Sequence, residues 1–395
     1  MIAEPLSRPP LSLPNRLAKA AMSENLAGRD GAPSEALIKL YERWSGSGCG
    51  LLITGNVMVD DRTRGERGNV VIEDARHIVL LRRWAAAAKQ GGARVFVQIN
   101  HPGRQAPRSL NREVVAPSAI AVKAGAMFAR PRALTEEEIK DLIARFARTA
   151  CIVREAGFDG VQVHGAHGYL ISQFLSPLAN QRDDAWGGDP ARRRHFLNEI
   201  LSTVRAAVGS DYPIALKLNS ADFQRGGFSE EESMAVVESL PAGTVDLLEI
   251  SGGTYEATAM MGAAREQRQS TREREAYFFD YAAKVRARCA AALMLTGGFR
   301  SRAGMEQALA SGAVDVIGLA RPLVVEPEFG QRLLSEADAT IEVRPVRSTG
   351  FHQLDGALET IWHSRQLERI GKGQQPDPRL GGLRAFFSYM WNSGR

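Results

Sequence analysis

Short runs of apolar residues alternate with longer helical patterns along this chain of 395 residues. Short buried strands that alternate with helices are typical of parallel βαβ units. Seven such runs are clear, and a weaker one precedes them at residues 19–22. The seven are residues 51–53, 95–97, 161–163, 214–218, 245–250, 293–295 and 314–317. Eight strands alternating with helices predict an α/β fold of the TIM (β/α)8 barrel type rather than a doubly wound sheet.

Two of the predicted helices begin with the spacing of a capping box. In this motif a hydroxyl side chain and a Glu three residues later bind each other's backbone N–H groups. Thr135 with Glu138 precedes one helix, and Ser229 with Glu232 precedes the other. Both signals support the alternation of strands and helices.

The last part of the chain has a helical pattern that ends in aromatic residues. No Pro- or Gly-rich stretch before it is long enough to separate domains. We therefore predict one barrel over residues 1–343 and a C-terminal helical tail over residues 344–395. The tail is expected to pack on the barrel or on a partner subunit. A homo-oligomer in which Arg395 reaches the neighbouring site is one form of this hypothesis.

The composition excludes several classes of protein. Hydrophobic residues make up 44% and charged residues 24% of the chain, as in ordinary globular proteins. The net charge of +5 comes from scattered arginines, and aromatics are only 7%, so a nucleic-acid partner is not expected. No apolar run has the length of a signal peptide core or a membrane span, which favours the cytoplasm and no membrane.

The cysteines show no pattern of their own. Cys49, Cys151 and Cys289 lie too far apart for a disulfide framework or a metal-site spacing. Cys151 lies in an apolar helical stretch and is expected to be a packed thiol.

The clearest candidate chemistry follows the fourth strand. His164, His167 and Tyr169 lie close together where the run 161–163 ends. Barrel enzymes place their chemistry at the carboxyl ends of the strands. Two imidazoles and a phenol at such a place can stabilise a developing oxyanion and supply a proton. The sequence therefore predicts an enzyme whose catalytic and substrate-binding residues are these three.

The last two strand ends have the residues of a phosphate site. Gly297 and Gly298 follow the seventh strand and would let the backbone approach a ligand closely. Arg321, after the eighth strand, could bind the same anion through charged hydrogen bonds. The alternative is that the glycines form tight turns and Arg321 pairs with a carboxylate. These residues alone leave both interpretations open.

A further loop and a second class of enzyme also fit the residues. The segment 254–274, with Tyr255 and Met260, is either a substrate lid or disordered. His101, His164 and His167 could hold zinc in a metal-dependent TIM-barrel hydrolase. Against this, the first strand lacks the His-x-His with which such hydrolases usually begin.

The residues also carry a resemblance to a known family. The run HGAHGYLISQFLSP from His164 resembles the central motif of the Old Yellow Enzyme family, FMN-dependent ene-reductases and NADH:flavin oxidoreductases on a TIM barrel. QINHPGR from Gln98 and GLARP from Gly318 resemble further motifs of this family, in the same order. The resemblance covers residues 5–335. It implies an FMN-binding barrel that takes hydride directly from NAD(P)H, because the chain lacks the cysteine cluster and added domains of the dienoyl-CoA reductases.

The resemblance assigns roles position by position. His164 and His167 would bind the carbonyl oxygen of an activated alkene or quinone, and Tyr169 would deliver a proton. Lys217 would face the N1/O2 edge of the flavin, and Ser23 would lie near its O4 or N5. The full set implied to bind FMN is Ala21, Met22, Ser23, Asn56, Gln98, Lys217, Gly297, Gly298, Ala320 and Arg321.

Three positions depart from the family pattern. Lys217 stands where relatives often carry Arg, so it keeps the charge but loses the planar fork. Ser23 stands where relatives carry Thr or Cys, so thiol-based redox tuning is excluded there. Asn25 stands where some bacterial members place a substrate-contacting Tyr.

Overall fold

The structure is a computed structural model, and it describes residues 1–123, 127–252, 278–343, 346 and 352–393. Only the backbone is described for residues 352–357 and 389–393. The candidate lid at residues 254–274, the side chains of Tyr389 and Trp391 in the tail, and Arg395 lie outside the described residues.

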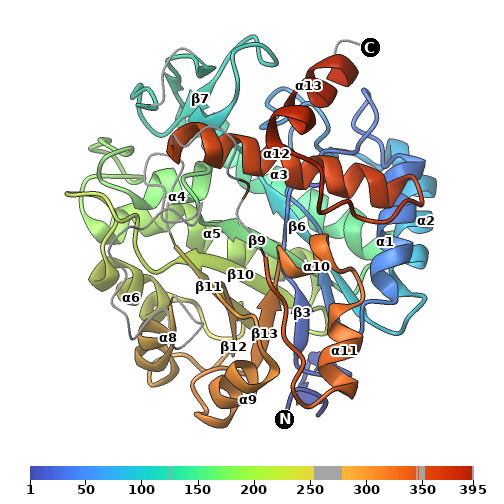
Figure 1. The fold of residues 1–395 in the computed structure, drawn as a ribbon. Coiled ribbons are helices and arrows are strands. Elements are labelled where there is room, and N and C mark those ends of the chain that lie inside the picture. Colours follow the sequence, from blue (N-terminus) through green and yellow to red (C-terminus); the bar gives the residue numbers. More distant parts are fainter. Residues whose placement is uncertain (124–126, 253–277, 344–345, 347–351, 394–395) are drawn as a thin grey trace.

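Eight parallel strands close into a barrel, as predicted (Figure 1). The first barrel strand pairs with both the second and the last, which leaves no open edge. The strands are β3 (Leu17–Lys19), β4 (Leu51–Ile53), β6 (Arg94–Asn100), β9 (Gly160–Gly165), β10 (Ile214–Asn219), β11 (Leu247–Ser251), β12 (Ala292–Thr296) and β13 (Val316–Leu319). The short β5 (Val57–Met58) extends the pairing of β6.

Helices follow the strands and surround them (Figure 1). They are α1 (Glu35–Ser45), α2 (Ile78–Lys89), α3 (Glu136–Glu155), α4 (Leu170–Leu175), α5 (Pro190–Val208), α6 (Glu230–Ser239), α8 (Phe279–Arg286), α9 (Arg302–Ala310), α10 (Pro322–Val325) and α11 (Phe329–Ser335). Both predicted capping boxes are present, at the starts of α3 and α6. Short 3-10 turns, η1 (Ala75–His77) and η2 (Gly103–Gln105), lie in the connections.

Two pairs of short strands lie outside the barrel sheet in the described part of the chain. The hairpin of β1 (Leu6–Arg8) and β2 (Leu11–Leu13) packs Leu6, Leu11 and Leu13 against the barrel interior. The other pair is β7 (Val115–Ala116) with β8 (Arg132–Ala133).

The first strand lies earlier than the sequence suggested. It covers Leu17–Lys19, whereas the pattern favoured residues 19–22. Lys19 ends this strand, although the pattern had placed it at the start. Its charged side chain is fully buried: Nζ donates to the carbonyl of Ile53 at 2.6 Å and lies 4.6 Å from the centre of the Trp44 ring. Residues 20–23 therefore leave the barrel as a connecting segment, which places them at its mouth.

The interior of the barrel changes from apolar to polar toward the carboxyl ends of the strands. Its apolar part includes Phe96, Ala215, Leu247, Ala292, Met294 and Val316. Alternate residues of a strand face the same side, so the interior position recurs every second residue. Two residues after Phe96, Ala215 and Leu247 come Gln98, Lys217 and Glu249. The apolar layer thus supports a buried polar layer directly above it.

The tail contains two helices, α12 (His352–Gly371) and α13 (Gly382–Ser393). Helix α12 lies against α1 and α10, across the barrel (Figure 1). Leu367 and Ile370 of α12 are buried in the main hydrophobic core. The division of the chain at residue 343 stays a prediction.

The structure corrects the expected burial of Cys151. Cys151 is exposed rather than packed, because it lies on the outer face of α3 while the next two residues, Ile152 and Val153, face inward. In the described part of the chain, no helix combines the length and the apolar character that crossing a membrane requires.

Candidate active site at the carboxyl ends of the barrel strands

The polar layer inside the barrel is one connected network. Gln98 of β6 donates from Nε2 to Oε1 of Gln162 on β9, at 2.7 Å. Gln162 in turn donates from Nε2 to Oε2 of Glu249 on β11, also at 2.7 Å. Register explains the first contact, because Gln98 and Gln162 are directly opposite each other in neighbouring strands. The predicted flavin ligand Gln98 is therefore held in place by its neighbours.

Glu249 is the centre of this network, although the sequence predicted no role for it. Its side chain has no exposed surface, and its Oε1 atom lies 3.0 Å from Nζ of Lys217. The same oxygen accepts a hydrogen bond from Thr296 Oγ1 at 2.7 Å. A buried carboxylate is stable only when it is paired and fully hydrogen-bonded, as it is here. Counting in twos from Leu247 would have placed this acid inside the barrel.

His164 is a neutral hydrogen-bond donor. Burial lowers the pKa of its imidazole well below the usual value, and the positive charge of Lys217 lowers it further. Its Nδ1 atom accepts the backbone N–H of Ala166 at 3.2 Å, so the ring proton is on Nε2. The strand β9 thus presents an N–H group with a fixed tautomer.

His167 and Tyr169 complete the predicted cluster. The rings of His167 and Tyr169 lie 5.1 Å and 4.9 Å from the His164 ring, both edge to face. His167 adopts the left-handed region (φ 61°), and its Nε2 atom lies 2.8 Å from Ser251 Oγ. Burial lowers the pKa of His167 well below the usual value too. Ser251 is the last residue of β11, the sixth barrel strand, but the sequence predicted no role for it.

The segments after β3 and β4 meet at the mouth of the barrel. Ser23 Oγ lies 2.8 Å from Asn56 Oδ1, which links two of the predicted flavin-binding residues. Glu24 accepts the backbone N–H of Gly55 at 2.8 Å and the hydroxyl of Tyr41. A side chain at Gly55 would come closer than 3.0 Å to Glu24 and to the Met22 carbonyl. Ala21 and Met22 are half-buried in the same segment.

The predicted phosphate residues line one pocket. It is formed by the segments 296–300 and 318–322. Gly297 and Gly298 have φ values of 127° and 91°, which only glycine adopts without strain. Arg321 borders the pocket together with Ala320, and its Nη1 atom lies 2.8 Å from Oε1 of Glu359 on α12. The glycines therefore line a pocket, as the phosphate interpretation expects, whereas Arg321 pairs with a carboxylate, as the alternative interpretation expects.

His101 has different surroundings from the His164 cluster. Its Nδ1 atom accepts the N–H of Gly103 at 3.1 Å, and the ring lines a pocket with Asp60 and Arg62. Burial lowers its pKa to about 4. In the portions of the chain that the structure describes, no group of three His, Cys, Asp or Glu residues could hold a metal ion. The zinc hydrolase hypothesis is therefore not favoured.

Asn25 has a structural contact. Its Oδ1 atom accepts the backbone N–H of Gly68 at 2.6 Å, and its φ value is 57°. The residue thus fixes the neighbouring loop.

Comparison with known proteins identifies the family of the chain. Residues 2–339 match the NADH:flavin oxidoreductase / NADH oxidase family. The chain belongs to this family. The NADH-dependent flavin oxidoreductase iliE of Hypocrea jecorina (strain QM6a) is 37% identical over 360 residues, which covers 84% of this chain and 89% of the relative. A protein of the same name from Neonectria sp. (strain DH2) is 37% identical over 404 residues; the match covers 90% of this chain but only 52% of that relative.

A solved structure supports the fold. The old yellow enzyme homologue from Zymomonas mobilis superposes with a TM-score of 0.73, over 87% of this chain and 94% of that one, at 23% identity. Membership of the NADH:flavin oxidoreductase family confirms the predicted resemblance and the predicted class, an FMN-dependent NAD(P)H oxidoreductase. FMN as cofactor and NAD(P)H as reductant are confirmed with it. The roles of the individual residues stay predictions.

Proposed function

We propose that this NADH:flavin oxidoreductase reduces the C=C bond of an activated alkene, of the enone or quinone type. The observation that carries the proposal is the neutral His164 imidazole, whose tautomer is fixed by Ala166, next to His167 and Tyr169. A neutral N–H donor suits a carbonyl oxygen on which negative charge develops during the reaction. The cytoplasm remains the expected compartment.

The residues present fit FMN. The pocket beside Gly297 and Gly298 has the exposed backbone and the neighbouring Arg321 that a phosphate group requires. The polar layer of Gln98 and Lys217 offers hydrogen-bond donors to the edge of a flavin ring. Ser23 and Asn56 would border the same ring from the segments after β3 and β4.

The reaction assigns each protein group one task. The bound flavin, once reduced by NAD(P)H, supplies the hydride for the β-carbon of the alkene. His164 and His167 hold the carbonyl oxygen and stabilise the charge that develops on it. Tyr169, whose ring packs edge to face on His164, delivers a proton to the α-carbon. Ser251 orients the His167 ring, so the pair of donors is set before the substrate arrives.

The test is an anaerobic flavin titration. The purified protein is loaded with FMN, reduced with NADH or NADPH, and mixed with 2-cyclohexenone. The proposal expects the visible flavin bands to bleach and then to return with the enone. His164→Ala should raise the enone concentration needed for reoxidation, whereas Tyr169→Phe should slow reoxidation with little change in that concentration. His195→Ala, on the exposed face of α5, is the matched control.

Two results would contradict the proposal. Reduced enzyme that reoxidises with oxygen but with neither enones nor quinones would confine the activity to NADH:flavin oxidation. Colourless protein that takes up zinc but no FMN would instead restore the hydrolase hypothesis.

A further inference from the structure

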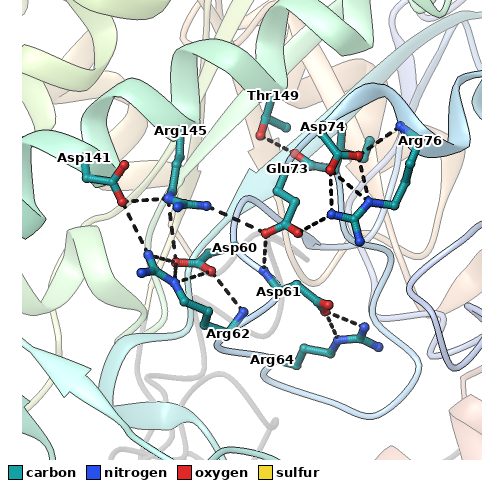
Figure 2. A network of polar contacts seen from close by, with 11 residues as sticks. Asp60, Asp61, Arg62, Arg64, Glu73, Asp74, Arg76, Asp141, Arg145 and Thr149 are labelled. Atoms are coloured by element: carbon teal, nitrogen blue, oxygen red, sulfur yellow. Dashed lines mark hydrogen bonds and ion pairs between the residues drawn. The ribbon is translucent and has the colours of Figure 1, made fainter.

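The loop between β5 and η1, residues 59–74, is anchored on one side by α3 (Figure 2). Asp141, Arg145 and Thr149 of α3 are spaced four residues apart and so lie on one face of the helix. Arg145 pairs with Asp141, and its charge also faces Asp60 at 3.9 Å and Glu73 at 3.7 Å. Thr149 Oγ1 donates to the carbonyl of Ile72 at 2.5 Å. These contacts fix the base of the loop.

The tip of the loop is fixed on the opposite side, at the mouth of the barrel. The N–H of Gly68 donates to Asn25 Oδ1, and the N–H of Ala27 donates to the Gly68 carbonyl at 2.9 Å. The N–H of Glu66 donates to Asn69 Oδ1 at 2.6 Å. Glu66 is therefore held between two anchored points, and its carboxyl group lies next to the segment after β3.

The carboxyl group of Glu66 contacts Ser23. Oε2 of Glu66 lies 2.5 Å from Ser23 Oγ, which also lies 2.8 Å from Asn56 Oδ1. A serine hydroxyl has one proton, so it can donate to only one of these two oxygens. The Asn56 amide presents this oxygen because its Oδ1 atom also accepts from Asn69 Nδ2 at 3.4 Å. A charged Glu66 would thus leave one of the two Ser23 contacts as an unfavourable approach of two acceptors. A protonated Glu66 removes the conflict, because it donates to Ser23 while Ser23 donates to Asn56.

The surroundings of Glu66 favour the protonated form. Residue Glu66 is partly exposed as a whole, but its carboxyl group is buried. Burial raises the pKa of this carboxyl and the negative charge of Glu24 raises it further, whereas hydrogen bonds from the side chains of Ser23 and Asn69 lower it. Glu24 accepts hydrogen bonds from Gly55 and Tyr41. Nζ of Lys19 lies 3.8 Å from Oε1 of Glu24, so Lys19 pairs with Glu24 rather than with Glu66.

We propose that Glu66 carries a proton at neutral pH and donates it to Ser23 Oγ, and that it is thereby a positioning residue for the Ser23 hydroxyl at the flavin. The second half rests on the proposed function, because it requires FMN next to Ser23. The two hydrogen bonds then run in the same direction, from Glu66 to Ser23 and from Ser23 to Asn56. Loss of the proton reverses the Ser23 hydroxyl and adds a negative charge near the flavin, which opposes its reduction.

The first experiment uses the protein without flavin. Infrared difference spectra between the wild type and Glu66→Gln are recorded at neutral pH, in H2O and D2O. We expect the wild type to show the C=O band of a protonated carboxyl group that Glu66→Gln lacks, and Ser23→Ala to shift this band. A difference spectrum with only carboxylate bands would refute the proposal.

The second experiment measures the reduction midpoint of bound FMN against pH. We expect the midpoint of the wild type to fall more steeply above neutral pH than that of Glu66→Gln, whose side chain cannot ionise. Glu155→Gln, which removes an exposed carboxylate at the end of α3 that contacts neither the loop nor Ser23, is the control and should keep the slope of the wild type. Equal slopes in the wild type and Glu66→Gln would refute the positioning role.

The outcomes also separate the two proposals. A protonated-carboxyl band in a protein that takes up no FMN would contradict the proposed function and support the assignment of the Glu66 proton. A protein that binds FMN and reduces enones, but whose Glu66 is charged, would support the proposed function and contradict the assignment of the Glu66 proton.

Discussion

Removing one partner of the buried pair of Lys217 and Glu249 should strongly destabilise the protein in the absence of flavin. Nζ and Oε1 are 3.0 Å apart, and the two side chains are 5% and 0% exposed. With an effective dielectric constant of about 20, two unit charges at this distance attract each other by roughly 5 kcal/mol. Removing only Lys217 leaves an unpaired buried carboxylate, which we expect to cost about 3–5 kcal/mol of the free energy of unfolding.

A double-mutant cycle isolates this interaction. Lys217→Met, Glu249→Gln and the double variant are unfolded in urea without FMN, and the coupling energy is taken from the four free energies. We expect the double variant to be more stable than Lys217→Met alone, because no charge is then left unpaired. The matched control is the exposed pair Lys284–Glu230, with side chains 59% and 43% exposed, which should couple by under about 1 kcal/mol. The reasoning would be refuted if the buried pair coupled no more strongly than this surface pair.

Three further predictions address the other parts of the site. Gly55→Ala should destabilise the protein by about 1–3 kcal/mol and weaken FMN binding, because its Cβ would crowd Glu24 and the Met22 carbonyl. The control Gly46→Ala should do neither, because its Cβ would lie 3.6 Å from the nearest atom. Unfolding in urea and flavin titration check both variants. Arg321→Ala should weaken FMN binding by about 1.5–3 kcal/mol, measured by fluorescence titration, and unchanged affinity would remove Arg321 from the phosphate site. Because the pKa of His101 is about 4 in the folded chain and about 6.5 in the unfolded chain, the unfolded state binds the proton first as the pH falls. Stability should therefore be lost between about pH 6.5 and about pH 4, by roughly 3 kcal/mol for this residue. His101→Gln should lose less stability than the wild type over the same pH range, and equal losses would contradict the assignment.

The parts of the fold and site that the sequence predicted depend on local patterns. Alternation of short apolar runs with helices is enough to predict the barrel, and the strand-end rule places His164 and Tyr169 at its mouth. Gly297 and Gly298 were also found in this way. Each of these signals is contained in a few consecutive residues, so no long-range contact had to be known.

The residues that were missed depend on contacts between distant segments. Glu359 meets Arg321 only because the tail helix folds back on the barrel, and Glu66 meets Ser23 only because α3 and Asn25 fix its loop. Neither acid has a motif of its own. Glu249 differs, because the period of two along its strand indicates an inward side chain; an acid in an apolar strand was a readable signal.

The order in which the barrel closes has a consequence for synthesis on the ribosome. The first barrel strand, β3, pairs with the last, β13, and the Arg321 beyond β13 pairs with Glu359 of the tail. A nascent chain that ends before residue 359 lacks the carboxylate that pairs with Arg321. A chain that ends before β13 also leaves one edge of β3 without its partner strand. Unpaired strand edges are the part of an incomplete chain that aggregates or recruits chaperones. Retention of the yellow cofactor should therefore distinguish completed chains from truncated translation products.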